Sequence, residues 1–300
     1  MPKLNTIIRS LIGEYKKFII KRGFLKTPYG LNKDEKRARR IIVSLTSYGR
    51  RVTKLAPIVI HSMMTQTLKP DKIILWLDDI NWNRCNIPSN LKHLEACGLD
   101  IRFCKDIKSY KKLIPAIQAY PNDIIVTIDD DVYYEPTIIE ELYNAYKKDP
   151  NSIHAFLTST LKFEVMNNPN EYWCGEGHPN RFDFATGVGA ILYSKKLLHN
   201  DVTDEDKFLR LAPNADDIWF YFMEYLNNTH VNMVRNSNNK MSFYPLDSFY
   251  QYLHTNSSLN SSNLHQNQNN IQIRSVMQHY NIKIDDLKRF SKSNKNIRYE

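Results

Sequence analysis

The chain has 300 residues, 42% hydrophobic and 12% aromatic, which excludes a wholly disordered protein because such a chain can bury a sizeable core. The formal net charge of +9 sits at one end, since residues 1–40 hold 12 Lys and Arg against 3 Asp and Glu. Residues 41–300 hold 29 of each kind, and this neutral body argues against nucleic acid as a partner.

Residues 1–40 form a basic leader and linker. Apolar residues recur there at three- and four-residue spacing, which predicts an amphipathic helix. These residues are Leu4, Ile7, Ile8, Leu11, Ile12, Tyr15, Phe18 and Ile19. Two interpretations stay open: the helix lies on an anionic membrane surface, or it packs on its own domain with a solvated basic back. In the first case, removing residues 1–25 should release the protein from anionic vesicles without lowering turnover.

Short apolar runs alternate with helical segments through residues 41–150. The runs lie at residues 41–46, 72–77, 100–104 and 124–128, and each suits a buried strand. The alternation predicts an α/β fold with a mostly parallel, doubly wound, Rossmann-like sheet. The ligand crevice of such a sheet lies beyond the carboxyl ends of the strands, where Thr46, Asp78 and Asp129 fall.

The second half of the chain has a different pattern. Residues 151–255 are rich in aromatic residues and include a small-residue turn at 184–190 and a predicted helix at 216–225. Residues 256–272 are dominated by Asn, Ser and Gln, which predicts a polar loop followed by a tail to residue 300. The four cysteines form no CxxC pair, and the sequence shows neither a signal peptide nor an apolar run of about 20 residues. We therefore expect a cytoplasmic protein with reduced thiols, peripheral at the inner face of the cell membrane.

Three adjacent acids, Asp129, Asp130 and Asp131, directly follow the fourth predicted strand. Adjacent carboxylates repel one another unless a cation balances them. Asp129 and Asp131 can direct their oxygens onto one Mg²⁺ or Mn²⁺ ion, with substrate phosphates completing the shell. The alternative is a solvated acidic loop or a cap on the following helix.

The order of these features resembles that of GT-A glycosyltransferases, in particular the inverting family-two enzymes of bacteria. The likeness covers about residues 40–230. It rests on the strand ends described above, on a Thr-Gly-x-Gly turn at residues 186–189 and on the acidic pair that opens the helix at residue 216. It implies a GT-A fold in which residues 41–150 bind a nucleotide sugar and residues 151–255 bind the acceptor.

The resemblance also implies roles for particular residues. The implied donor-binding residues are Thr46, Ser47, Tyr48, Arg50, Asp78 and Asp130, each of which could instead be a turn or cap residue. Lys111 and Lys112 depart from the small-residue segment that the family carries at this place. We expect Lys112 to pair with a diphosphate oxygen as a point charge, and solvated helix surface is the alternative for one of the two lysines. Some GT-A enzymes supply a late histidine to the metal, for which His254 and His265 are candidates, although a surface histidine is the alternative for both.

Asp216 and Asp217 open a predicted helix. Helix capping alone explains one aspartate. Inverting transfer needs a carboxylate that removes a proton from the acceptor hydroxyl, and the family's base matches Asp217, with Asp216 as the second choice. In the preceding loop, Trp173 and Glu176 are candidates for acceptor contact, because aromatic faces stack on sugars and loops carry binding residues; a packed tryptophan is the alternative.

These features together predict a metal-dependent, inverting glycosyltransferase. It would move a sugar from a nucleotide-diphosphate sugar to a glycan or lipid-linked acceptor in bacterial surface polysaccharide synthesis. Two other classes stay open. A sugar nucleotidyltransferase usually opens with a glycine-rich phosphate loop, whereas residues 44–51 contain one glycine. The other is a membrane-tethered carbohydrate-binding protein without turnover.

Overall fold

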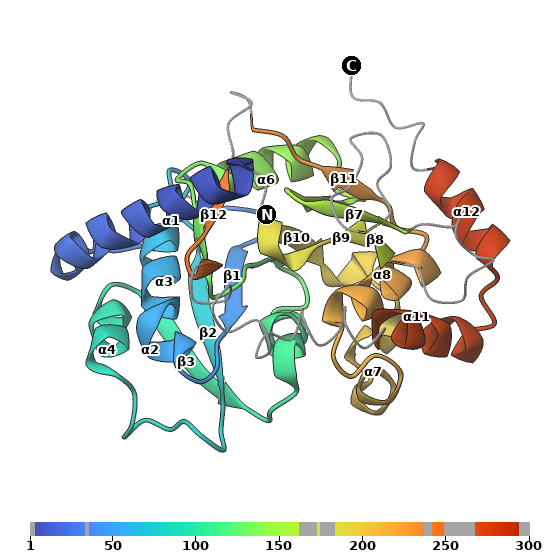
Figure 1. Cartoon of the computed structure of the whole chain (residues 1–300), viewed down its shortest axis with the longest axis horizontal. Helices are drawn as coiled ribbons and strands as arrows, with labels where there is room; N and C mark the ends of the chain where they lie inside the picture. The colour runs from blue at the N-terminus through green and yellow to red at the C-terminus, as the bar shows by residue number, and fades with distance from the viewer. Residues whose placement is uncertain are drawn as a thin grey trace.

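The computed structural model describes residues 4–33, 36–161, 173–174, 184–236, 242–248 and 268–293. Its centre is a seven-stranded sheet in the order β11-β6-β10-β4-β1-β2-β3 (Figure 1). The strands are β1 Ile41–Thr46, β2 Lys72–Asp78, β3 Leu99–Cys104, β4 Ile124–Thr127, β6 Ile153–Ala155, β10 Ile191–Ser194 and β11 Val231–Met233. The four strands predicted from the apolar runs are all present.

The central sheet is mostly parallel, as predicted. Strand β1 pairs in parallel with β2 and β4, β2 with β3, and β6 with β11, whereas β10 runs antiparallel to β4 and β6. Because β10 runs the opposite way, it begins at the edge where β4 ends, with Ile191 opposite Thr127. The small-residue turn before β10 therefore lies at the same edge as the carboxyl ends of β1 and β4.

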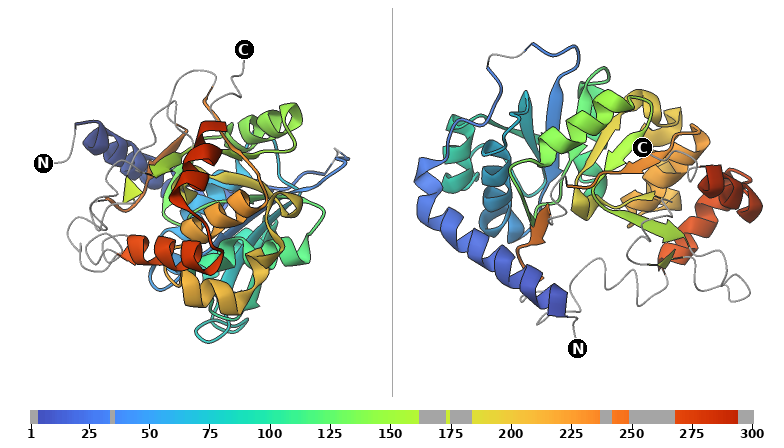
Figure 2. Two further views of the ribbon diagram at one scale, coloured as in Figure 1. Left: turned by 90° about the vertical axis from the view of Figure 1, so that its right-hand side faces the viewer. Right: turned by 90° about the horizontal axis from the view of Figure 1, so that it is seen from above.

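Helices cover both faces of this sheet (Figures 1 and 2). Alternate residues of β1 belong to different cores, since Ile41 and Val43 pack with α1, α3, α4 and α6, while Ile42 packs with α5, α7, α8, α11 and α12. The helices are α1 Leu4–Gly23, α2 Arg51–Lys54, α3 Ala56–Met64, α4 Ser89–Ala96, α5 Ile114–Ala119, α6 Ile138–Lys148, α7 Glu205–Leu211, α8 Asp216–Leu226, α11 Gln268–His279 and α12 Ile284–Ser293. The predicted doubly wound α/β class is confirmed.

Short elements connect these layers. The 3-10 helices are η1 Phe24–Lys26, η2 Lys108–Lys112, η3 Gly187–Gly189, η4 Lys195–Leu197 and η5 Asn200–Thr203. Two small sheets stand apart from the central one, β5 Val132–Tyr134 with β12 Phe243–Pro245, and β7 Thr158–Leu161 with β8 Trp173–Cys174 and β9 Phe184–Ala185.

The predicted N-terminal helix is present as α1, and it packs on the body of the protein beside β12, β5 and α3 (Figures 1 and 2). Its buried side carries Ser10, Gly13 and Ile20. Its outer side is apolar, with six side chains 39–63% exposed, namely Ile7, Ile8, Leu11, Tyr15, Phe18 and Ile19. Of the two interpretations, packing of the helix on its own domain is confirmed, but its outward side is an apolar stripe and not the expected solvated basic back. Among the described helices, none is both long enough and apolar enough to cross a membrane.

The predicted polar loop is wrong at its C-terminal end, because α11 begins at Gln268 and α12 follows in the predicted tail. Ile273 and Val276 of α11 are buried in the same core as α8. The polar residues near them have partners: the Gln272 side-chain oxygen accepts a hydrogen bond of 2.9 Å from the backbone N–H of Asn214. A hydrogen-bonded amide can be buried at little cost, so polar composition did not prevent a packed helix. Residues 256–267 lie outside the described part of the chain.

Candidate active site

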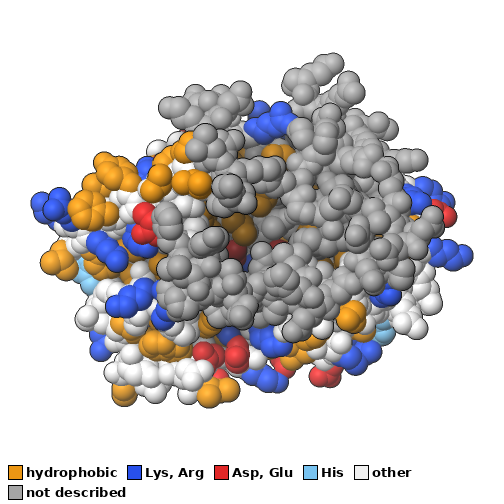
Figure 3. All heavy atoms as spheres, in the orientation of Figure 1, with side chains coloured by type: hydrophobic (Ala, Val, Ile, Leu, Met, Phe, Trp, Pro, Cys, Tyr) orange, Lys and Arg blue, Asp and Glu red, His pale blue; other side chains and the backbone are white. Residues whose placement is uncertain are grey.

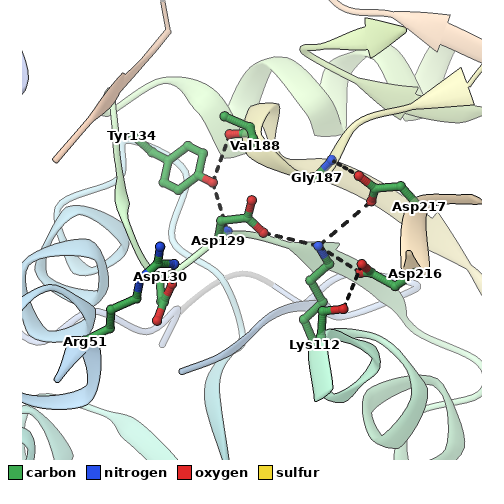
Figure 4. Close-up of polar contacts among 10 residues, drawn as sticks. Arg51, Lys112, Asp129, Asp130, Tyr134, Gly187, Val188, Asp216 and Asp217 are labelled. Atoms are coloured by element: carbon green, nitrogen blue, oxygen red, sulfur yellow. Dashed lines mark hydrogen bonds and ion pairs between the residues drawn. The ribbon is translucent and has the colours of Figure 1, made fainter. Parts of the chain in front are cut away.

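Three carboxylates from separate elements surround one buried lysine at the carboxyl-end edge of the sheet (Figure 4). Asp129 follows β4, Asp216 and Asp217 open α8, and Lys112 ends η2. The Lys112 Nζ lies 3.2 Å from Asp129 Oδ1, 3.0 Å from Asp216 Oδ2 and 3.9 Å from Asp217 Oδ1. One cluster therefore contains Lys112, Asp129 and Asp217, which were predicted to have three different roles.

Lys112 is the internal cation of this cluster. Its side chain is 9% exposed, and burial alone would lower the pKa of its ammonium group. The carboxylates of Asp129, Asp216 and Asp217 more than reverse this effect and raise the Lys112 pKa well above its ordinary value. The lysine therefore stays charged, and three carboxylates face a single positive charge.

The two neighbouring acids of α8 have different surroundings. Asp216 is 11% exposed in its side chain, and its Oδ1 accepts a 2.8 Å hydrogen bond from the Ser109 hydroxyl. Asp217 is 22% exposed, and its Oδ2 lies 3.4 Å from the donating N–H of Gly187. The expectation that one of the two acids caps the helix is wrong, because the N-cap residue is Ala215 and no side chain caps α8. Asp216 is held inside the cluster, and Asp217 is the more accessible acid.

The environment of Asp217 suits a group that exchanges a proton near neutral pH. Burial raises the pKa of Asp217 to about 7, although the Lys112 ammonium acts to lower it. Repulsion from Asp216 and Asp129 adds to the rise. A carboxylate with a pKa close to the working pH can both accept and release a proton.

Gly187 and Tyr134 shape the cluster. A Cβ atom at position 187 would lie 2.6 Å from Lys112 Nζ, which explains a small residue at this turn. The buried Tyr134 hydroxyl accepts a 3.0 Å hydrogen bond from the Asp129 N–H and donates one of 3.1 Å to the Val188 carbonyl (Figure 4). It thereby joins the acidic turn to the small-residue turn. Tyr134 was not predicted from the sequence, although it lies just three residues beyond the acidic triplet.

A second charged group lies beside the first, around Arg51. Its guanidinium contacts Asp130 Oδ1 through Nη1 and Asp131 Oδ2 through Nη2, both at 3.0 Å. Asp130 is 5% exposed and also accepts a 2.5 Å hydrogen bond from Ser47 Oγ. Burial raises the pKa of Asp130 to about 7, although Arg51 acts to lower it. Asp130 and Ser47, which were predicted to bind the donor, therefore join the end of β1 to the acidic turn. Arg51 was not predicted as a site residue.

The two predicted metal ligands of the acidic turn contact different cations. Asp129 contacts Lys112, and Asp131 contacts Arg51. Across the described residues, no group of three or more His, Cys, Asp or Glu side chains could hold a metal ion. Hard carboxylate oxygens of this kind still suit Mg²⁺ or Mn²⁺, which commonly takes one or two carboxylates and completes its shell with phosphates and water.

The other predicted donor residues lie along the same edge. Thr46 Oγ1 donates to the Trp76 carbonyl at 2.9 Å, and Arg50 forms an ion pair with Asp247. Asp78 accepts hydrogen bonds from the backbone and side chain of Asn81 at 2.8 and 2.7 Å, so it also shapes the turn after β2. Tyr48 is 47% exposed, and the Arg51 guanidinium lies over its ring, 5.3 Å from the ring centroid.

Several predicted residues cannot be placed. Glu176, His254 and His265 lie outside the described residues. Trp173 lies in β8, opposite Leu161 of β7, in one of the small sheets.

No protein-family model matches the sequence, and no curated protein matches it. Among solved structures, the chain is similar to S. aureus TarS residues 1–349 in complex with UDP, at 12% identity and a TM-score of 0.46, over 81% of this chain and 72% of that one. It is also similar to the same protein in complex with UDP-GlcNAc, at 12% identity and a TM-score of 0.44, over 68% of this chain and 58% of that one.

Proposed function

We propose that this protein is a glycosyltransferase of the GT-A type, which moves a sugar from a nucleoside diphosphate sugar onto an acceptor hydroxyl. The observation that carries the proposal is Asp217, a partly exposed carboxylate with a pKa of about 7, beside Asp129 at the carboxyl-end edge of a mostly parallel sheet. Ligands of such sheets bind at this edge.

In the proposed reaction, Asp217 takes the proton from the acceptor hydroxyl. The acceptor oxygen attacks the anomeric carbon of the donor, and the bond from that carbon to the diphosphate oxygen breaks. The nucleoside diphosphate leaves with the electron pair, and the sugar arrives with inverted configuration. Lys112 and Gly187 hold the Asp217 carboxylate in place during this step, since they contact its two oxygens.

We further propose that Asp129 and Asp131 hold Mg²⁺ or Mn²⁺ jointly with the donor diphosphate. Such an ion would act as a Lewis acid that offsets the negative charge of the leaving group. Because the described residues offer no group of three ligands, Mn²⁺ should bind far more tightly with UDP present than without it. Asp131→Asn should weaken the joint binding in calorimetry, and full transfer in excess EDTA would contradict the metal proposal.

The test of the reaction is a panel of nucleotide sugars with release of nucleoside diphosphate as the readout. Asp217→Asn should lower the rate roughly 10²- to 10⁴-fold, as expected for loss of a general base. The matched control is Asp285→Asn, because that aspartate is 83% exposed on α12. A sugar nucleotidyltransferase would release pyrophosphate instead, and a carbohydrate-binding protein would release neither. An Asp217→Asn protein with the wild-type rate, or a product that retains the donor's configuration, would refute the mechanism.

We also propose that the protein works at an anionic membrane surface on a glycan or lipid-linked acceptor. The outer side of α1 carries six half-exposed apolar side chains. Hydrophobic side chains gather at the upper left of Figure 3, over α1. Exposed Lys21 and Arg22 follow this stripe at the end of the helix. Apolar area flanked by positive charge is the composition that binds anionic lipid interfaces.

Vesicle co-sedimentation tests the membrane proposal. Leu11 and Phe18 are 55% and 51% exposed. Burying the exposed apolar surface of each side chain in the lipid interface should contribute about 1 kcal/mol to the binding free energy. The double change Leu11→Ser with Phe18→Ser should therefore weaken binding to phosphatidylglycerol vesicles by about 30-fold. Ile271→Ser on α11 is the matched control, since Ile271 is 53% exposed. Equal binding by the double variant would contradict the proposal.

A further inference from the structure

The buried side of α1 faces the strands that extend from the acidic turn. Ser10, Gly13, Lys17 and Ile20 recur at three- and four-residue spacing, which places them on one side of the helix. Opposite them lies the β5–β12 pair, in which β5 directly follows Asp131. This side of α1 therefore borders the candidate active site through a single layer of strands.

Gly13 allows an unusually close approach of α1 to β12. A Cβ atom at position 13 would lie 2.0 Å from the carbonyl oxygen of Pro245 and 3.6 Å from Tyr244 Cβ. Any side chain there would push the helix away from the strand. A glycine within a helix lowers its stability by about 1 kcal/mol relative to alanine, so its presence is explained by the contact and not by helix formation.

Lys17 makes the polar link between the helix and the acidic turn. Its Nζ donates a 2.8 Å hydrogen bond to the carbonyl oxygen of Leu246. Leu246 is fully buried, and its backbone N–H donates a 2.8 Å hydrogen bond to the carbonyl oxygen of Asp131. Leu246 is thus bonded to α1 on one side and to the acidic turn on the other. Lys16 adds a parallel tie through a 2.8 Å ion pair with Glu135, just after β5.

We propose that the inner side of α1 is a positioning element for the active site. Gly13 lets the helix pack against Pro245, Lys17 fixes Leu246, and Leu246 fixes the main chain at Asp131. The catalytic consequence rests on the proposed function, because there Asp131 contributes to donor binding. The positioning role predicts instead that removing residues 1–25 lowers turnover. The two sides of one helix have separate roles, with the outer side contacting lipid and the inner side holding the acidic turn.

Hydrogen exchange measured on the full-length protein tests this positioning role directly. Lys17→Met should accelerate amide exchange in residues 129–135 and 242–248 by about tenfold, the effect of one lost hydrogen bond from a charged group. Lys17→Arg should restore most of the protection. Lys21→Met is the matched control, since Lys21 is an exposed lysine of the same helix, and the outer-side variant of Leu11 and Phe18 should leave both segments unchanged.

The same variants are then compared for calorimetric affinity toward UDP and GDP with Mn²⁺. Lys17→Met should bind the preferred nucleotide about tenfold more weakly, while the outer-side variant binds as wild type does. Unchanged exchange in both segments, or faster exchange with unchanged nucleotide affinity and turnover, would overturn the positioning role. A wild-type protein that turns over no nucleotide sugar would remove the proposed function instead, and the exchange data would still decide whether α1 holds the acidic turn.

Discussion

Replacing Asp217 by Asn should lower the transfer rate roughly 10²- to 10⁴-fold and yet stabilise the protein at neutral and alkaline pH. In the folded state burial raises the pKa of Asp217 from 3.8 to about 7. Between these two values the folded protein keeps a proton that the unfolded chain loses, so the carboxyl group lowers the free energy of unfolding as the pH rises. At 1.36 kcal/mol per unit, this penalty reaches about 4 kcal/mol above pH 7. Asn carries no charge at any pH and removes it.

Asp216→Asn at the neighbouring position is the control, because it should destabilise the protein. Asp216 is the carboxylate closest to the buried Lys112, at 3.0 Å. Asp216→Asn deprives that ammonium of its nearest partner, and removing one member of a buried ion pair costs about 3–5 kcal/mol. We expect a loss of about 3 kcal/mol, at the low end of that range, because Asp129 and Asp217 remain near the lysine.

Urea unfolding at pH 5 and pH 8 measures both effects. The gain from Asp217→Asn should grow from less than about 2 kcal/mol at pH 5 to about 4 kcal/mol at pH 8, because the penalty accumulates between the two pKa values. Asp216→Asn should destabilise the protein at both pH values. A gain that does not change with pH, or a loss of stability from Asp217→Asn at pH 8, would refute a raised Asp217 pKa.

Three further predictions concern the same cluster. The transfer rate of the wild-type protein should rise with pH, with a midpoint near 7 and a plateau above it, because Asp217 must be ionised to accept a proton; a profile that is flat from pH 5 to 8 would contradict this. Gly187→Ala should lower activity and reduce the free energy of unfolding by about 1–3 kcal/mol, because the added Cβ would lie 2.6 Å from Lys112 Nζ. The control is Gly23→Ala, which has open space around it and should be neutral in thermal unfolding. Tyr134→Phe should reduce the free energy of unfolding by about 1–3 kcal/mol and lower kcat, because it leaves the Asp129 N–H and the Val188 carbonyl without their partner. An unchanged kcat would show that this link is not needed for turnover.

Four of the seven strands of the central sheet could be predicted from the sequence, chiefly because β1, β2 and β4 are buried on both faces. Such strands are continuous apolar runs, as at residues 41–46 and 124–128, and the segments between them are helical. Helix α11 was missed for the opposite reason, since Gln272 is buried through a hydrogen bond to the distant Asn214. Composition carries no information about a partner 58 positions away in the chain.

The location of the site was predictable, but the partners of its side chains were not. Strand ends converge by topology, so Asp78 and Asp129 could be assigned to one edge from the order of strands alone. Which of three adjacent acids turns inward depends on tertiary contacts, and Asp130 does so because Ser47 and Arg51 contact it. The pairing of Lys112 with both acids of α8 likewise joins elements about a hundred residues apart, which periodicity cannot reveal.

The balance of charge at this edge gives a physical reason for a cation that arrives with the donor. Lys112 and Arg51 contact the carboxylates of the acidic turn, and Arg50 forms an ion pair with Asp247, so each of these cations already contacts an aspartate of the protein. With Asp217 ionised, the Lys112 cluster holds three carboxylates against one ammonium and repels a diphosphate. A donor can therefore approach only with additional positive charge, or after an arginine exchanges an aspartate for a phosphate oxygen. In the proposed reaction, ionising Asp217 makes the base available and at the same time weakens donor binding. A divalent ion would relieve this conflict, because it would attract both the carboxylates and the phosphates.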